Sequence, residues 1–393
     1  MLRVFESFAG IGTQRMGLER AGIEHDVVGI CEIDKFAIES YKAIHGDVNN
    51  YGDIAKIDPK DLPDFDLFTY SFPCQDISMA GKQKGFDKES GTRSSLLWEC
   101  ERIIEAKRPK YLLMENVKAL TFKKNKGGYQ KWLDILTSLG YTNYPKVLNA
   151  KDYGVPQNRE RVFCISILDD KQGFEFPGKQ VLETRLKDVL ENNVDEKYYL
   201  SNDRVKQLVG IVRNWGVKGK TVFDSSIVEP ELIQTHKLNN DKRDNPNAFR
   251  VFDKDGISPT LNTCQGGGRQ PCVLDNQGIK TIPIKNGTKK GYLEAHKGDG
   301  IDLINPTCNN RRGRVQKDCS QTLTCNNDRG VVTDDFRIRK LTPLEFWRLM
   351  GIDDKDFYKA KKVNSDSKLY KQAGNAIVVD VLAAIFMQLF NKK

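Results

Sequence analysis

The sequence places a thiol at the end of an apolar stretch, where it could act as a nucleophile. Residues 67–70 (LFTY) predict a short buried strand, and Pro73 fixes the backbone immediately before Cys74. The thiol is therefore expected at a strand end rather than inside a core. A cysteine is a catalytic nucleophile only where its thiolate is stabilised and a substrate can reach it. A buried structural cysteine is the alternative, and other motifs must decide between the two.

A carboxylate and two arginines follow in positions that suit proton transfer and anion binding. Residues 111–114 predict a second buried strand, and Glu115 follows directly. Burial raises the pKa of such a carboxyl group, which can then donate or shuttle a proton; a helix-capping or ion-paired role is the alternative. Arg159 and Arg161, two residues apart at the start of a predicted strand over 162–167, share one face. They could clamp a phosphate or a base carbonyl, or form surface ion pairs.

The start of the chain predicts a nucleoside pocket on a Rossmann-like unit. A strand over residues 2–8 leads into a turn with Gly10 and Gly12 and then a helix. Glu32 follows a second strand, where a carboxylate binds ribose hydroxyls, and Asp53 lies in a loop that could meet an adenine amino group. The dinucleotide motif G-x-G-x-x-G is incomplete because its third glycine is missing. A tight turn without a ligand and a solvated carboxylate are the alternatives.

Composition indicates an ordinary soluble protein in a reducing compartment, which we take to be the cytoplasm. The chain has 393 residues, and its nine cysteines, an odd number without regular spacing, argue against a disulfide framework. Four histidines and the lack of a Cys-x-x-Cys pair argue against zinc. No apolar run approaches the roughly 18 residues that span a bilayer. The net charge of +9 permits a polyanionic partner without proving one.

Eight sequence blocks, taken in order, resemble the DNA cytosine 5-methyltransferases. The blocks are FAGIGT (8–13), CEIDKFA (31–37), GDI (52–54), SFPCQ with GKQKGF (71–86), ENV (115–117), QNRERV (157–162), RKLTPLEFWRLMG (339–351) and QAGNAI (372–377). The resemblance implies a Rossmann-like α/β domain with a mixed, mostly parallel sheet, and a smaller irregular β-rich target recognition domain. It also implies S-adenosyl-L-methionine as the methyl donor and double-stranded DNA as the substrate, bound by a monomer.

The resemblance assigns the chemistry to the residues already singled out. In the family, the thiolate matching Cys74 attacks carbon 6 of a cytosine flipped out of the duplex, which makes carbon 5 nucleophilic towards the methyl group. Glu115 would hold a proton at the ring nitrogen. Arg159 and Arg161 would contact the base carbonyl and a neighbouring phosphate. Residues 81–95 would form a loop that closes over the flipped base.

Further residues are implied to bind the cofactor and the DNA. The cofactor residues are Phe8, Gly10, Ile11, Gly12, Glu32, Ile33, Asp53, Ile54 and Asn375. Ile33 stands where many relatives have an aromatic residue that stacks on adenine, so an aliphatic contact would replace it. Residues expected to contact DNA are Gln75, Ser78, Gly81, Arg269, Arg311, Arg312 and Arg329. For any single arginine in this group, an ordinary solvated loop is the alternative.

We expect three parts along the chain. Residues 1–175 form the catalytic and cofactor-binding domain, 176–350 the target recognition domain, and 351–393 a helical return to the catalytic domain. Segments 250–273 and 314–331 share an Arg-Val, Ser-x-Thr-Leu and Cys pattern, which indicates a weak internal duplication. The cysteines of this region lack zinc spacing, so we expect no metal.

The expected function is sequence-specific DNA cytosine methylation by a bacterial or phage modification enzyme. A tRNA cytosine 5-methyltransferase of the same fold is one alternative, but the Cys-Phe-Thr signature of those relatives is not found. A catalytically inactive DNA-binding relative is another. Loss of Cys74, Glu115 or the glycine turn would indicate it, and all three are present.

Overall fold

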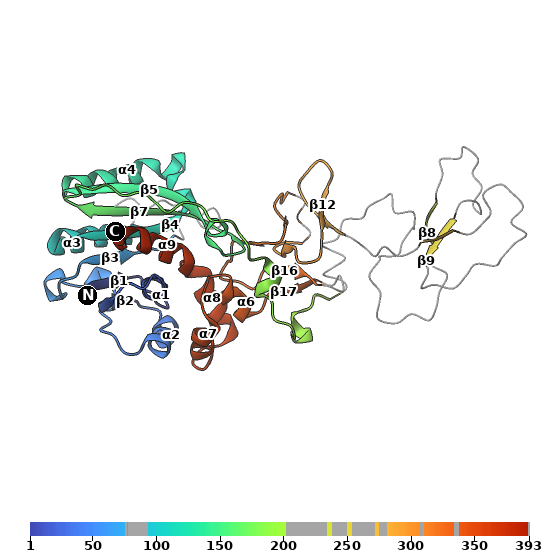
Figure 1. Ribbon diagram of the computed structural model, residues 1–393, viewed down its shortest axis with the longest axis horizontal. Coiled ribbons are helices and arrows are strands. Elements are labelled where there is room, and N and C mark those ends of the chain that lie inside the picture. The colour runs from blue at the N-terminus through green and yellow to red at the C-terminus, as the bar shows by residue number, and fades with distance from the viewer. Residues whose placement is uncertain are drawn as a thin grey trace, which may run out of the picture. The chain divides into compact units, whose positions relative to one another are not determined.

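The computed structural model describes residues 1–74, 77, 93–201, 234–237, 250–253, 272–274, 281–306, 308, 310–333 and 338–391 (Figure 1). The chain divides into two compact units. The catalytic unit comprises Met1–Val194, Asp318–Asp328 and Leu341–Lys393, and the second unit comprises Asp195–Lys317 and Arg329–Lys340. The three-part division expected at residues 175 and 350 stays a prediction.

A six-stranded sheet of order β2-β1-β3-β4-β7-β5 forms the centre of the catalytic unit. Its strands are β1 (Leu2–Ser7), β2 (His25–Cys31), β3 (Leu67–Tyr70), β4 (Tyr111–Val117), β5 (Tyr141–Asn149) and β7 (Glu160–Leu168). The first four are parallel, whereas β7 pairs antiparallel with both β4 and β5. The predicted mixed, mostly parallel α/β sheet is confirmed. Because β1 to β4 are parallel, their carboxyl ends meet at one edge, where such sheets bind ligands.

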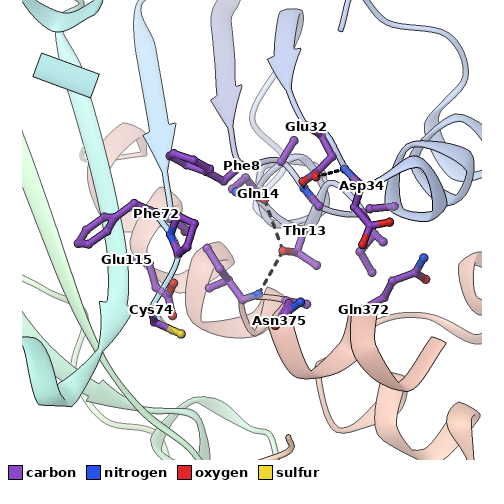
Figure 2. A pocket seen from close by; sticks show the side chains of 18 of the residues that line it. Phe8, Thr13, Gln14, Glu32, Asp34, Phe72, Cys74, Glu115, Gln372 and Asn375 are labelled. Carbon is purple, nitrogen blue, oxygen red and sulfur yellow. Dashed lines mark hydrogen bonds between the residues drawn. The ribbon is translucent and has the colours of Figure 1, made fainter. Parts of the chain in front are cut away.

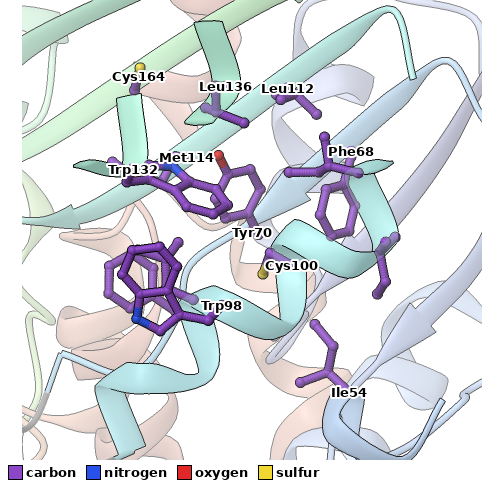
Figure 3. Packing of buried hydrophobic residues seen from close by; sticks show 14 of the residues in the cluster. Ile54, Phe68, Tyr70, Trp98, Cys100, Leu112, Met114, Trp132, Leu136 and Cys164 are labelled. Carbon is purple, nitrogen blue, oxygen red and sulfur yellow. The ribbon is translucent and has the colours of Figure 1, made fainter. Parts of the chain in front are cut away.

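Helices α1 (Thr13–Arg20), α2 (Lys35–His45), α3 (Leu97–Lys107) and α4 (Lys123–Ser138) connect the strands. Aromatic residues fill the core on the side of β3 and β4 (Figure 3). Trp132 of α4 packs edge-on against Tyr70 and Trp98, with ring centroids 5.9 and 5.8 Å away. Such edge-to-face pairs add to the stabilisation from burial alone. This packing fixes β3 and β4, which carry the candidate nucleophile and carboxylate.

The C-terminal segment completes the catalytic unit with helices α6 (Pro343–Arg348), α7 (Asp354–Lys361), α8 (Asp366–Asn375) and α9 (Val379–Phe390). The sequence Thr-Pro-Leu-Glu at 342–345 predicts a capping box at the start of α6, and it is present. Glu345 N–H donates to the Thr342 hydroxyl at 3.3 Å, and Thr342 N–H donates to the Glu345 carboxylate at 2.8 Å.

Helix α9 packs on α1, beside the first βαβ unit (Figure 1). The approach is close, because a Cβ on Gly17 would lie 2.6 Å from Leu382 Cβ. Within the described ranges, the stretch Asp366–Phe390 is long and apolar enough to span a membrane, but 61% of its most apolar window is buried. We interpret it as core packing.

The second unit is small and rich in β-strands. One sheet has the order β14-β13-β16-β17, with strands β14 (Val315–Gln316), β13 (Gly300–Asp302), β16 (Arg329–Val332) and β17 (Ile338–Lys340). A hairpin pairs β11 (Ile282–Lys285) with β12 (Tyr292–Ala295), and a third sheet joins β8 (Gln234–Lys237), β9 (Arg250–Asp253) and β10 (Cys272–Leu274). The predicted duplication stays untested, because most of segment 250–273 lies outside the described residues.

Candidate active site

One cavity of about 280 Å³ opens at the carboxyl edge of the parallel strands and collects most of the predicted residues (Figure 2). Those that line it are Phe8, Gly10, Ile11, Glu32, Ile33, Asp53, Ile54, Cys74, Glu115, Arg159, Arg161 and Asn375. Cys74 and Glu115 lie together at one end, and Glu32 lies at the other (Figure 2). Gln75, Ser78 and Gly81 lie outside the described residues. The site is therefore one elongated cavity with a thiol and a carboxyl group at one end.

The loop after β1 takes a backbone path that favours glycine. Phe8, Gly10 and Gly12 have φ values of 55°, 58° and 79°, in the left-handed region. Gly12, the N-cap of α1, is not among the residues that line the cavity. A Cβ there would lie 2.5 Å from His45 Nε2, so its role is to let the turn pass close to α2.

The Glu32 carboxylate ties this glycine loop to the loop after β2. Its oxygens accept backbone N–H bonds from Gly10 at 2.8 Å, from Ile33 at 2.8 Å and from Asp34 at 2.7 Å. The carboxylate thus lies in the cavity wall with a fixed orientation. Ile33 is 72% exposed at the same wall, so its apolar side chain is available to a flat ligand.

Asn50 holds together the loops that carry Glu32 and Asp53, a role that no sequence motif marks. Its Nδ2 donates to the Glu32 carbonyl at 3.0 Å, while its Oδ1 accepts from the N–H groups of Glu32 and Gly52 at 3.1 and 3.0 Å. Asp53 then follows, and its carboxylate accepts from Ala55 N–H at 3.1 Å. The sequence Asn-Tyr-Gly-Asp at 50–53 indicates a turn, but it does not predict that the Asn50 side chain bridges the two loops.

Two side chains fix the loop that carries Cys74. Asn116, at the end of β4, donates to the Phe72 carbonyl at 2.9 Å, and the Ser94 hydroxyl donates to the Pro73 carbonyl at 2.6 Å. The thiol itself is half-buried. Burial and the charge of Glu115 raise the pKa of Cys74, whereas Arg161 and Arg159 oppose that rise. Burial therefore favours the protonated thiol, and the two arginines favour the thiolate.

Glu115 and Arg161 form a buried ion pair beside the thiol. Arg161 Nε lies 3.2 Å from Glu115 Oε1, and both side chains are largely shielded from solvent. Burial raises the pKa of Glu115, while Arg161 and then Arg159 act to lower it. Burial therefore lets this carboxyl group hold a proton more readily than an exposed one, and the arginines favour its release.

Arg159 has a different environment from Arg161, although both line the cavity. It lies between β6 (Gln157–Asn158) and β7, and its guanidinium donates to the carbonyls of Leu323, Gly374 and Ala376 at 3.3, 3.0 and 2.8 Å. Burial and the neighbouring Arg161 lower the pKa of Arg159 to about 9. Arg159 thus connects its own strand to residues 323 and 374–376. Arg161 is the arginine that contacts the Glu115 carboxylate.

A second cysteine contacts the predicted cofactor residue Asn375. Cys325 Sγ donates to Asn375 Oδ1 at 3.1 Å. The two segments touch closely, because a Cβ on Gly374 would lie 2.6 Å from the Thr324 carbonyl oxygen. From its sequence context, Cys325 suggests only a metal ligand, and its spacing is not that of a zinc site. Among the described residues, no group of three or more His, Cys, Asp or Glu side chains could hold a metal ion.

The arginines expected to contact DNA differ in exposure. In the second unit, Asp302 pairs with Arg329 at 3.0 Å and also with Arg311, and Arg329 is buried. Arg312 is exposed, and Arg269 lies outside the described residues. Arg329 and Arg311 thus form a charge cluster on Asp302, whereas Arg312 presents its charge to solvent.

Comparisons with known proteins agree with this arrangement. A family model for the C-5 cytosine-specific DNA methylases matches residues 2–391. The chain is 37% identical over 446 residues to the type II methyltransferase M2.ScrFI of Lactococcus lactis subsp. cremoris, with 100% of each chain covered. It is 33% identical over 442 residues to the orphan methyltransferase M.SPRI of Bacillus phage SPR, covering 99% of this chain and 98% of that one. In fold it resembles the Dnmt2 methyltransferase of S. pombe (TM-score 0.56, 18% identity, 100% and 99% covered).

Proposed function

The chain belongs to the C-5 cytosine-specific DNA methylase family, and from that premise we propose how its residues carry out the reaction. The protein is a DNA (cytosine-5-)-methyltransferase, with bacterial and phage modification enzymes as relatives. The alternatives, a tRNA methyltransferase and an inactive relative, are not favoured, because the family match spans the chain and the catalytic groups are present. We further propose that it acts as a monomer on double-stranded DNA in the cytoplasm.

We propose S-adenosyl-L-methionine as the cofactor of the cavity. The wall fits it: the space beside Gly10 is open, with nothing within 4 Å of a Cβ built there. The Glu32 carboxylate suits ribose hydroxyls, and the exposed Ile33 offers apolar surface to adenine. Asp53 would bind the adenine amino group at one end of the cofactor, and Asn375 would bind the polar groups at its methionine end. When bound, the cofactor supplies an electrophilic methyl group.

The nucleophile in this proposal is Cys74. Its thiol gives its proton to water, and sulfur bonds to carbon 6 of the flipped cytosine. The electron pair of the carbon 5–carbon 6 double bond moves into the carbon 4–carbon 5 bond, and the carbon 4–nitrogen 3 pair moves onto the ring nitrogen. Glu115 delivers a proton to the ring nitrogen, which prevents charge from building on the base. After carbon 5 has taken the methyl group, it gives its proton to water, the carbon 5–carbon 6 double bond re-forms, and the Cys74 thiolate leaves. The ring nitrogen returns its proton to the Glu115 carboxylate.

The two arginines divide the supporting work. Arg161 lies 3.2 Å from the Glu115 carboxylate and stabilises its ionised form after the proton has been given up. Arg159 joins the carbonyls of the 323 and 374–376 segments, so it positions Asn375 and the wall opposite Cys74. Both positive charges favour the Cys74 thiolate over the thiol.

A single observation supports the proposal most strongly. Cys74 follows β3, and Glu115 lies near the end of the adjacent parallel strand β4. Both residues line the same cavity as the glycine loop and Glu32. Bisulfite sequencing of genomic DNA treated with the protein and S-adenosyl-L-methionine tests it. Protected cytosines that share a short motif would support the proposal and give the target sequence. No protection by a folded, cofactor-binding protein would overturn it.

A further inference from the structure

The segment that follows β4 is unusually basic. Residues 118–131 contain five lysines and no aspartate or glutamate, and Lys123, Lys124 and Lys126 lie exposed in the first turns of α4. The first turn of α4 has no acidic residue, and its N-cap residue Phe122 makes no side-chain capping bond. Cations at a helix N-terminus oppose the helix dipole, at a cost of roughly 0.3–1 kcal/mol each. A sequence that breaks a local rule in this way suggests a functional demand.

The basic segment begins at the rim of the catalytic cavity. Val117, the last residue of β4, lines the cavity together with Glu115. Lys118 follows and pairs at 2.9 Å with Glu160, the neighbour of Arg161. The first lysine of α4, Lys123, therefore follows five residues after Lys118, which this ion pair ties to the strand that carries Arg161.

The backbone that presents the lysines is well fixed. The buried Asn125 donates from its side chain to the Ala119 carbonyl at 2.8 Å. The N–H groups of Asn125 and Lys126 both donate to the Phe122 carbonyl, at 2.8 and 2.9 Å. Phe122 itself is 42% exposed, which adds apolar surface beside the charges. The turn thus presents an ordered cationic surface to solvent.

We propose that Lys123 and Lys126, with Phe122 beside them, contact the sugar–phosphate backbone of the DNA duplex next to the flipped cytosine. This α4 basic patch would supply substrate affinity from the catalytic unit, in addition to contacts from the recognition region. Charge complementarity and continuity with the cavity single out the phosphates of the substrate as the occupant. Such contacts set the position of the duplex and carry no base information. The inference rests on the proposed function.

The test measures DNA affinity against salt for the double variant Lys123→Ala/Lys126→Ala in the full-length protein. The matched control is Lys110→Ala/Lys171→Ala, which removes two exposed lysines at the opposite edge of the same sheet. Each lost phosphate contact reduces the magnitude of the slope of log K against log salt by about 0.9. The slope of the patch variant should therefore be smaller than that of wild type by about 1.8. With curves that converge near 1 M salt, this is an affinity loss of about 60-fold at 0.1 M.

Two duplexes separate the possible outcomes. One contains the motif found by bisulfite sequencing, and the other is an unrelated duplex of equal length. The patch variant should bind both duplexes more weakly than wild type, by the same factor. Its kcat at saturating DNA and its affinity for S-adenosylhomocysteine should be unchanged. A wild-type slope in the patch variant, or an equal loss in the control variant, would overturn the inference. If the wild type methylates no DNA, the proposed function itself fails, whatever the slopes.

Discussion

Replacing Glu6 with glutamine should change how the stability of the catalytic unit depends on pH. Glu6 lies in β1 and is fully buried, and the Tyr41 hydroxyl donates to its carboxylate at 3.0 Å. Burial raises the pKa of Glu6 from 4.5 to about 7, although the Tyr41 hydrogen bond and the charge of Arg15 oppose that rise. The folded protein therefore prefers the protonated acid.

The size and sign of the effect follow from this pKa difference. Below pH 4.5 both the folded and the unfolded states carry the proton, so Glu6 imposes no ionisation cost. Between pH 4.5 and about 7 the unfolded chain ionises first, and the free energy of unfolding falls as the pH rises. The total loss is about 3 kcal/mol, and it is complete above about pH 8. Glu6→Gln cannot ionise, so it should lack this loss.

Urea unfolding at pH 5 and pH 8 measures the effect on wild type, Glu6→Gln and the exposed control Glu24→Gln. The difference in unfolding free energy between Glu6→Gln and wild type should rise by about 2.5 kcal/mol, in favour of the variant, from pH 5 to pH 8, because part of the loss has already occurred at pH 5. The control should follow the wild type. Parallel profiles for wild type and Glu6→Gln would refute the assignment of a raised pKa to burial.

Three further changes address the site. Arg161→Ala should raise the pKa of Glu115 further and lower kcat at least tenfold, with cofactor affinity unchanged; an unaltered pH–rate profile would contradict the ion-pair role. Asn116→Ala should free the cysteine loop and lower kcat about 10- to 100-fold while the protein stays folded; wild-type turnover would contradict it. Cys325→Ala should weaken S-adenosylhomocysteine binding in calorimetry by a few-fold, and Cys325→Ser should restore it; equal affinity of both with wild type would exclude the contact.

Local sequence signals were sufficient for the strands and helices that bring the site together. The strand over 2–8, the strand over 67–70 and the capping box at Thr342 rest on periodicity and cap chemistry, and each is present in the structure. Strand β5 and the first half of α4 have no such signal, although a helix around 132–139 is predicted. Strand β5 contains Pro145 and polar residues, which an edge strand tolerates. Helix α4 begins at Lys123, whose lysine- and glycine-rich first turns lack helix signals.

The candidate site could be named from the sequence, but its supporting contacts could not. Motifs identified Cys74 and Glu115, because their residue types mark the chemistry. The three carbonyl partners of Arg159 lie more than 160 residues away in the chain, so no local pattern predicts them. The same holds for Asn116 and Cys325, whose types are common and whose role depends on what folding places beside them.

The central claim is that Cys74 forms a covalent bond with carbon 6 of the target cytosine. It is tested by trapping the adduct on a long duplex made with 5-fluorodeoxycytidine, in which fluorine replaces the proton that must leave carbon 5. In the presence of S-adenosyl-L-methionine, peptide mass spectrometry should find DNA attached to Cys74, and Cys74→Ser should give no adduct. Methylation without any trapped protein, or attachment at another cysteine such as Cys325, would contradict the account.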